Sequence, residues 1–197
     1  MWKKRKPSAK LTWQPMNHHL EFEHWVPFPL ESVFAFFSNA ENLPRIMPAS
    51  TGTRLIRLDR TPPSSRSITA GAKQAVSVGS VIVTSSRILP FLPIRMQWIS
   101  RIAEFEWDHY FVDIQERGPF RRWHHRHQFE RQPRNGVDGT VVRDEIDYEV
   151  SFGLLGWVAN RFFIAPQMQD TFAHRQRVLP ELLARPTQAF PRQGTGE

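Results

Sequence analysis

The sequence contains no cysteine among its 197 residues. This absence excludes disulfide bonds, cysteine-ligated metal sites and a cysteine nucleophile, and it leaves the cellular compartment open. The sequence also has no glycine-rich loop of the kind that cradles phosphate. No serine lies in the sharp turn that presents a hydrolase nucleophile. The residues therefore point away from nucleotide-dependent enzymes and from enzymes that use a serine or cysteine nucleophile.

Long apolar runs are missing as well, and nothing approaches the ~20 residues of a membrane-spanning helix. Lysine and arginine at positions 3–6 and 10 resemble the first part of a signal peptide. Residues 11–20 are too polar, however, to form the apolar segment that should follow. We therefore expect a cytoplasmic protein in which residues 1–17 form a flexible basic tail.

Tyrosine is scarce, with two residues against 15 phenylalanines and seven tryptophans. Rings without hydroxyl groups suit an apolar interior better than a polar recognition surface. The net charge of +7 suggests anionic partners such as nucleic acid, phospholipid or acidic metabolites. Much of the excess lies in the first ten residues, so a solvated basic tail is the simpler interpretation. The length suits one domain, placed at 18–185, followed by a disordered tail at 186–197.

Hydrophobic periodicity predicts an α+β protein. Residues 19–26 alternate as a strand, and residues 30–37 carry apolar side chains at helical spacing. Asn39 can cap a second short helix. Further strands are expected within 52–58, 74–88 (one or two strands), 94–107, 109–115, 118–131 and 140–150. Together they should form a curved antiparallel sheet of six to seven strands, with a mobile loop at 59–73 and an apolar turn at Pro90–Pro93.

The chain after Gly153 changes to a helical period. One long amphipathic helix would place a single set of apolar side chains over the sheet, namely Val158, Phe162, Ala165, Phe172, Leu179 and Leu183. Pro166 removes a backbone hydrogen bond, so we expect a kink near Phe162. Pro180 should kink the helix again or end it.

The stretch Gly118–Arg131 carries the most distinctive pattern. Its odd positions from 123 to 129 are aromatic or imidazole, and its even positions are charged or polar. His125 and His127 therefore share the buried face, about 6.5–7 Å apart. The opposite face is basic, but the aromatic side chains that could stack on nucleic acid bases point away from it. The pattern accordingly weakens an RNA-binding interpretation.

Two neighbouring histidines need a third or fourth donor to hold a metal ion. The available carboxylates are Asp113, Glu104 and Asp144, and the sequence singles out none of them. We therefore predict no metal and no cofactor. Two interpretations stay open. His125 and His127 could be held by buried hydrogen bonds in a structural role, or they could orient a ligand from the wall of a cavity.

Asp144 and Tyr148 lie four residues apart on one face of the 140–150 strand. If this strand pairs antiparallel with 118–131, Asp144 faces the two histidines, and His125, His127 and Asp144 become the candidate catalytic residues. The ligand-binding candidates are Trp98, Trp123, His125, His127, Asp144, Tyr148 and Phe162. The aromatic members could equally be ordinary core.

Several pieces between Leu20 and Leu183 resemble one family. They are VFAFFSNAENLPRIMP, PFLPIRMQWISRI, FVDIQERGPFRRWHHRHQFE, GTVVRDEIDYEV and the closing helix. They are similar to the SRPBCC or START-like superfamily, the polyketide cyclase/dehydrase and lipid transport group. The W-x-H-x-H-x-F and D-x-x-x-Y strands resemble an uncharacterised bacterial cyclase/dehydrase-like subgroup. The sequence departs from the family pattern at Pro166 and at the 59–73 loop.

The resemblance implies a helix-grip fold with a hydrophobic cavity under the long helix. It implies no single reaction, since members include lipid carriers, hormone receptors, aromatase/cyclases and quinone-binding proteins. We expect binding, with or without transport, of a hydrophobic or aromatic small molecule or lipid. The alternatives are a cyclase- or dehydratase-like enzyme and a module that contacts RNA or anionic membrane. The oligomeric state is left open.

Overall fold

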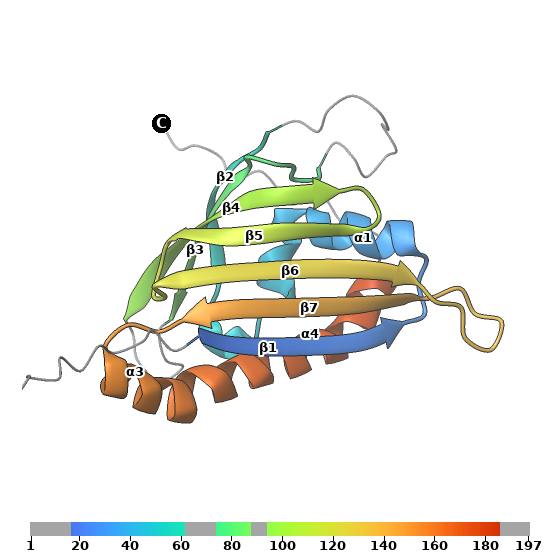
Figure 1. Ribbon diagram of the computed structural model, residues 1–197. Coiled ribbons are helices and arrows are strands. Elements are labelled where there is room, and N and C mark those ends of the chain that lie inside the picture. Colours follow the sequence, from blue (N-terminus) through green and yellow to red (C-terminus); the bar gives the residue numbers. More distant parts are fainter. Residues whose placement is uncertain (1–16, 62–73, 88–93, 186–197) are drawn as a thin grey trace, which may run out of the picture.

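The computed structural model describes residues 17–61, 74–87 and 94–185 (Figure 1). Seven strands form one antiparallel sheet in the order β1-β7-β6-β5-β4-β3-β2. Their bounds are β1 (Asn17–Val26), β2 (Arg54–Asp59), β3 (Val81–Arg87), β4 (Arg95–Glu106), β5 (Tyr110–Arg117), β6 (Arg122–Arg131) and β7 (Thr140–Glu149). Strand β1 joins the sheet beside β7, so the first and last strands are neighbours at one edge of the sheet.

Short helices connect the first two strands, as the apolar spacing predicts. They are α1 (Leu30–Ser38), η1 (Ala40–Asn42), α2 (Leu43–Ile46) and η2 (Ala49–Thr51). Pro29 precedes α1, and its carbonyl accepts hydrogen bonds from the N–H groups of Ser32 and Val33. The Asn39 side chain accepts a 3.1 Å hydrogen bond from the Glu41 N–H and so caps η1. A proline and an asparagine thus start these helices, as their positions in the sequence indicate.

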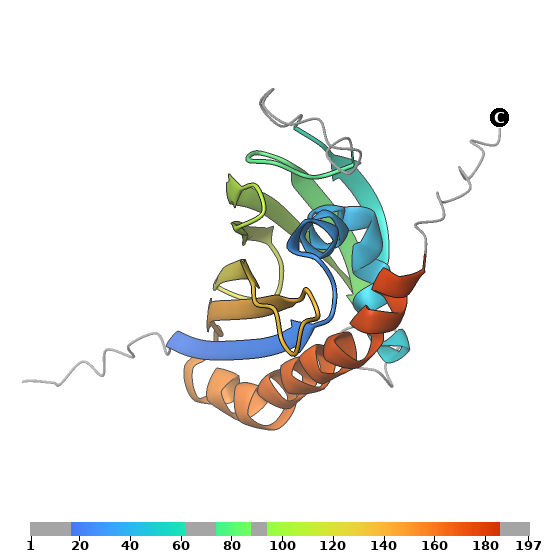
Figure 2. The same cartoon turned by 90° about the vertical axis from the view of Figure 1, so that its right-hand side faces the viewer.

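The sheet curves strongly. Figure 2 shows it bending around α1, while α4 runs along the open side of the curve. Irregular pairing between β4 and β5, after Ile99 and after Ile102, adds to the bend, since a bulge increases local twist. The α+β class, the curved antiparallel sheet and the long closing helix of a helix-grip fold are therefore confirmed. Within the described ranges, no helix has the length and apolar character needed to cross a membrane.

The buried core is built from the faces that strand alternation selects. His125, His127 and Phe129 of β6 and the even positions of β7 are buried, as predicted, and Trp123 is half-buried. Phe34 of α1 is fully buried and forms edge-to-face ring contacts with Phe105, Phe111 and Phe129, at centroid distances of 5.5, 6.2 and 5.2 Å. Such pairs add roughly 0.5–1.5 kcal/mol beyond area burial. The core therefore fixes α1 inside the curve of the sheet.

The closing helix is not one continuous amphipathic helix. It consists of α3 (Gly153–Ala159), a π-helical turn η3 (Asn160–Ile164) and α4 (Ala165–Ala184). In η3 the Ala165 N–H bonds the Asn160 carbonyl, five residues back. Pro166 lacks the N–H that an α-helix would direct at the Phe162 carbonyl. The wider π turn therefore lies where α-helical hydrogen bonding is interrupted. The irregularity expected near Phe162 is present, whereas Pro180 stays inside α4.

The prediction that one apolar helix face runs from Val158 to Leu183 is wrong. A π turn contains about one residue more than an α turn, and one residue corresponds to a rotation of roughly 100°. The side chains before the turn therefore leave the face on which Phe172 and Leu179 are buried. Val158 is 38% exposed and Phe162 is 62% exposed. Periodicity at 3.6 residues cannot anticipate this change of register.

Several expected segments lie outside the described residues. They are the tails before Asn17 and after Arg185, most of the 59–73 loop, and the Pro90–Pro93 turn. Residues 74–88, predicted to hold one or two strands, contribute the single strand β3. The segment before β3 is nevertheless buried at Ala75 and Val76. The Val76 N–H bonds the carbonyl of Ser38 at the end of α1.

Candidate functional site

A cavity of about 410 Å³ lies between the concave face of the sheet and the helices α1, α2 and α4. This volume is in the range of small-molecule sites. Its wall is largely apolar, and aromatic rings form much of it: Phe37, Trp98, Phe111, Phe120, Trp123 and Phe172. Trp98 meets Trp123 edge-to-face at 4.9 Å, and Phe120 stacks on Trp123 at 5.1 Å.

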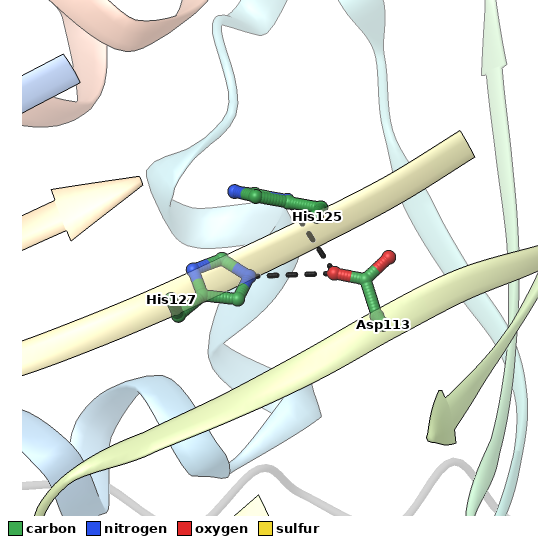
Figure 3. Close-up of side chains that lie close together, drawn as sticks. All are labelled: Asp113, His125 and His127. Carbon is green, nitrogen blue, oxygen red and sulfur yellow. Dashed lines mark ion pairs between the residues drawn. The ribbon is translucent and has the colours of Figure 1, made fainter. Parts of the chain in front are cut away.

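One side of this cavity carries a polar cluster, which we define as Asp113, His125, His127, Asp144 and Arg175. Strand register brings its members together. Asp113 of β5 pairs with His125 of β6, and His127 pairs with Asp144 of β7. Cross-strand partners place their Cβ atoms about 4.5–5.5 Å apart on the same face. Figure 3 shows both imidazoles directed at the Asp113 carboxylate.

Each imidazole of the polar cluster lies between two carboxylates. Asp113 Oδ2 is 3.4 Å from His125 Nδ1 and 3.4 Å from His127 Nε2. On the other side, Asp144 Oδ1 forms a 3.0 Å hydrogen bond with His125 Nε2. It also lies 2.7 Å from His127 Nδ1, although that contact lacks the alignment of a hydrogen bond. The two rings are 3.8 Å apart between centroids.

Burial and charge act in opposite directions on these groups. Burial alone would lower the pKa of His125, but the close polar contacts and negative charges of Asp113 and Asp144 raise it above the usual value. Burial disfavours the ionised form of Asp144, yet the positive Arg175 and the two histidines hold its pKa well below the ordinary range. His125 and His127 likewise lower the pKa of Asp113 against the effect of burial. Both carboxylates are therefore ionised.

Arg175 ties the closing helix to this cluster. It projects from α4, is only 7% exposed, and places Nη2 3.8 Å from Asp144 Oδ1. Its guanidinium group also lies over the ring of Phe172, 4.6 Å from the centroid. A buried arginine needs such a partner, because an unpaired charge in an apolar interior is strongly disfavoured. Helix and sheet are thus joined by an ion pair on the cavity side.

A second group of polar side chains in contact with one another lies at the π turn. Tyr148 donates a 2.8 Å hydrogen bond to Asn160 Oδ1, and Asn160 Nδ2 lies 3.2 Å from His18 Nδ1. Burial raises the pKa of Tyr148 and lowers that of His18. These three residues connect β7, η3 and β1.

The structure distributes the predicted site residues over three environments. Trp98, Trp123, His125 and His127 line the cavity. Asp144 and Tyr148 are buried behind its wall, at 1% and 2% exposure, and are not part of the lining. Phe162 lies on the outer side of the π turn and does not reach the cavity. Glu104, one of the candidate carboxylates, is on the outer face of the sheet near Arg126.

Sequence reasoning missed Arg175 and did not single out Asp113. A signal for Arg175 existed: Phe172, Arg175 and Leu179 share one helical face, and a cation on an apolar stripe predicts a buried partner. Asp113 could not be chosen over Glu104 without the register between β4, β5 and β6, which depends on the irregular pairing in β4. Long-range register is invisible to local periodicity.

The comparison with family models matches residues 26–175 to the family described as polyketide cyclase / dehydrase and lipid transport. The comparison with curated proteins gives no match.

Three solved structures show the same fold at low sequence identity. The protein TTHA0849 from Thermus thermophilus is 16% identical with a TM-score of 0.58, covering 84% of this chain and 97% of its own. The Zhui aromatase/cyclase from Streptomyces sp. R1128 is 9% identical with a TM-score of 0.60, covering 85% and 94%. Norcoclaurine synthase from Thalictrum flavum is 13% identical with a TM-score of 0.53, covering 91% and 96%.

Proposed function

Since this chain belongs to the polyketide cyclase / dehydrase and lipid transport family, we propose that it binds a hydrophobic or aromatic small molecule between its sheet and α4. The observation that carries the proposal is the cavity of about 410 Å³. A largely apolar wall with a few polar groups gathered on one side is the usual form of a small-molecule site.

The distribution of polar groups suggests how such a ligand is oriented. The rings of Trp98, Phe120 and Trp123 offer flat apolar surfaces to a fused or single aromatic ring. The Trp123 indole N–H is buried and has no hydrogen-bond partner among the described residues. His125 and Asp113 supply a second polar contact on the same wall. A ligand with an apolar body and one oxygen-bearing end fits this arrangement.

Occupying the cavity with a side chain tests the proposal. Ser100 of β4 is buried in the cavity wall, and Gln97 of the same strand is exposed. Ser100→Phe should raise the Kd for the apolar fluorophore anilinonaphthalene sulfonate by about tenfold, since one lost aromatic contact costs ~1.4 kcal/mol or more. Gln97→Phe, the matched control, should leave the Kd unchanged. Equal Kd values for Ser100→Phe and the unaltered protein would contradict the proposal.

A specific observation supports a second candidate function, contact with an anionic lipid surface. Seven large apolar side chains around α3 and η3 are exposed by 38–85%, and we call them the apolar patch: Phe152, Leu154, Leu155, Trp157, Val158, Phe162 and Phe163. Single exposed apolar residues are ordinary, but a contiguous group marks an interaction site.

The charge of the surrounding residues favours an anionic lipid surface as the partner of the apolar patch. Residues 152–164 contain no acidic side chain, and Arg161 lies among the exposed rings. The whole chain carries a net charge of +7. Tryptophan and phenylalanine with a basic residue are typical of helices that lie in the membrane interface, where anionic lipids add electrostatic attraction. A bilayer would also be a source of the apolar ligand.

Vesicle sedimentation tests this second candidate. The protein should bind phosphatidylcholine vesicles that contain phosphatidylserine, and less strongly those without it. Replacing Leu155 and Phe162 together with serine should weaken binding at least tenfold, because each large apolar side chain contributes about 1.5–3 kcal/mol on burial. Val137→Ser, at another exposed apolar position, is the control. Concentration-dependent dimers that the double variant abolishes, without vesicle binding, would instead assign the patch to a second copy.

A further inference from the structure

We propose that Asp113, His125 and His127 bind a divalent transition-metal ion in the wall of the cavity. One nitrogen of each imidazole and one oxygen of the carboxylate lie within 4.8 Å of one another. All three side chains belong to the described residues of β5 and β6, two adjacent strands whose register is fixed by pairing. Two imidazoles and one carboxylate are a donor set suited to zinc, iron and cobalt.

The distances favour an ion over direct hydrogen bonds. His125 Nδ1 and His127 Nε2 are each 3.4 Å from Asp113 Oδ2. A hydrogen bond between a charged imidazole and a carboxylate would be about 2.7–2.9 Å long. Donor atoms bound at about 2.1 Å around a tetrahedral ion lie about 3.4 Å apart. The two measured separations therefore match two edges of a tetrahedral coordination shell.

The outer carboxylate of the cluster gives an independent reason. Asp144 Oδ1 accepts a 3.0 Å hydrogen bond from His125 Nε2 and lies 2.7 Å from His127 Nδ1. One nitrogen of each ring thus faces Asp144, while the other nitrogen faces Asp113. A carboxylate behind metal-binding histidines is the usual supporting group, because it fixes the orientation of the rings.

Charge and access are also consistent with a bound ion. Arg175 is 3.8 Å from Asp144 and offsets its negative charge, so the Asp113 charge remains to hold the metal. Asp113, His125 and His127 line the cavity, and the fourth coordination position therefore opens into it. A carboxylate, phenolate or enolate oxygen of the ligand would complete the shell. The metal site deepens the proposed ligand-binding function and rests on it only for this fourth ligand.

Metal titration of the full-length protein tests the site. Chelator-treated protein should bind one Zn²⁺ by calorimetry. One Co²⁺ should bind with the intense visible absorption of tetrahedral coordination. His127→Ala and Asp113→Asn should each weaken Zn²⁺ binding by at least about 100-fold, whereas Asp144→Asn, which acts through the histidines, should weaken it by about 10–100-fold. His124→Ala is the matched control, since His124 directly precedes the ligand His125 in sequence but lies on the other face of β6.

Circular dichroism establishes that each variant is folded. Asp113→Asn keeps the size and shape of the side chain, whereas His127→Ala removes most of it. The site is refuted if the unaltered protein binds no Zn²⁺, or if the folded His127→Ala and Asp113→Asn variants bind it as tightly as His124→Ala. Anilinonaphthalene sulfonate binding is measured in parallel on chelator-treated protein. Retained fluorophore binding without Zn²⁺ binding overturns the metal site alone, and the reverse result overturns the proposed apolar ligand alone.

Discussion

Two aspartates on β7 show how much the environment of a residue decides. Asp144 is 1% exposed and contacts two histidines and an arginine, whereas the Asp147 side chain is 54% exposed and, within the described residues, pairs only with His19. Water screens the exposed Asp147–His19 pair strongly, but it screens the buried contacts of Asp144 much less. Two aspartates only three positions apart on one strand therefore differ in their roles: the buried one has a structural role, and the exposed one has almost none.

This contrast predicts different losses of stability. Asp144→Ala leaves Arg175 without its carboxylate partner and should lower the free energy of unfolding by about 3–5 kcal/mol. Asp147→Ala removes an exposed ion pair and should cost less than about 1 kcal/mol. Urea denaturation of metal-free protein, with m-values compared to confirm a common unfolded state, measures both. Similar losses for the two variants would show that Asp144 is not part of a buried charge network.

At the scale of the element, the π turn η3 separates two different helices. Before it, α3 exposes apolar side chains; after it, α4 buries Phe172, Arg175 and Leu179 against the sheet. Asn160 in the turn bonds Tyr148 of β7 and contacts His18 of β1. This buried amide accordingly fixes the irregular turn to the sheet edge, where a regular helix would need no such connection.

We therefore expect Asn160→Leu to destabilise the protein by about 1–3 kcal/mol, because it leaves the Tyr148 hydroxyl without its acceptor. Tyr148→Phe should cost less, and the double variant should lose about 0.5–1.5 kcal/mol less than the sum of the single changes. Arg161→Leu, at the next position of the same turn, should have an effect within about 0.5 kcal/mol. Strict additivity in chemical denaturation would exclude the coupling between Asn160 and Tyr148.

At the scale of the whole molecule, the outer face of the sheet is mixed in charge. Arg143 pairs with Glu21 and Glu23, and Arg126 lies near Glu104. Five of the 26 basic residues instead fall within the first ten positions, outside the described residues. A continuous basic surface is the footprint expected for nucleic-acid binding, and the sheet does not provide one. The apolar patch on α3 and η3 is the more distinctive surface.

The sequence by itself determined most of the strands, the buried faces of several of them, and the short helices. Strand alternation identified the inward positions of β1, β6 and β7, including His125, His127 and Asp144, because side chains in a strand have a strict period of two. Proline and asparagine positions located the short helices and the break before Pro166. These features depend on neighbours in sequence, and local rules are sufficient for them.

Only the tertiary structure decided which residues meet. The register of β5 on β6 selected Asp113 over Glu104 as the third group beside the histidines. The π turn moved Phe162 to the surface and left Arg175 beneath the helix, because one extra residue rotates a helix face by about 100°. Both outcomes depend on register between segments far apart in the chain. Such register is set by the global packing of the sheet against the helix rather than by any local pattern.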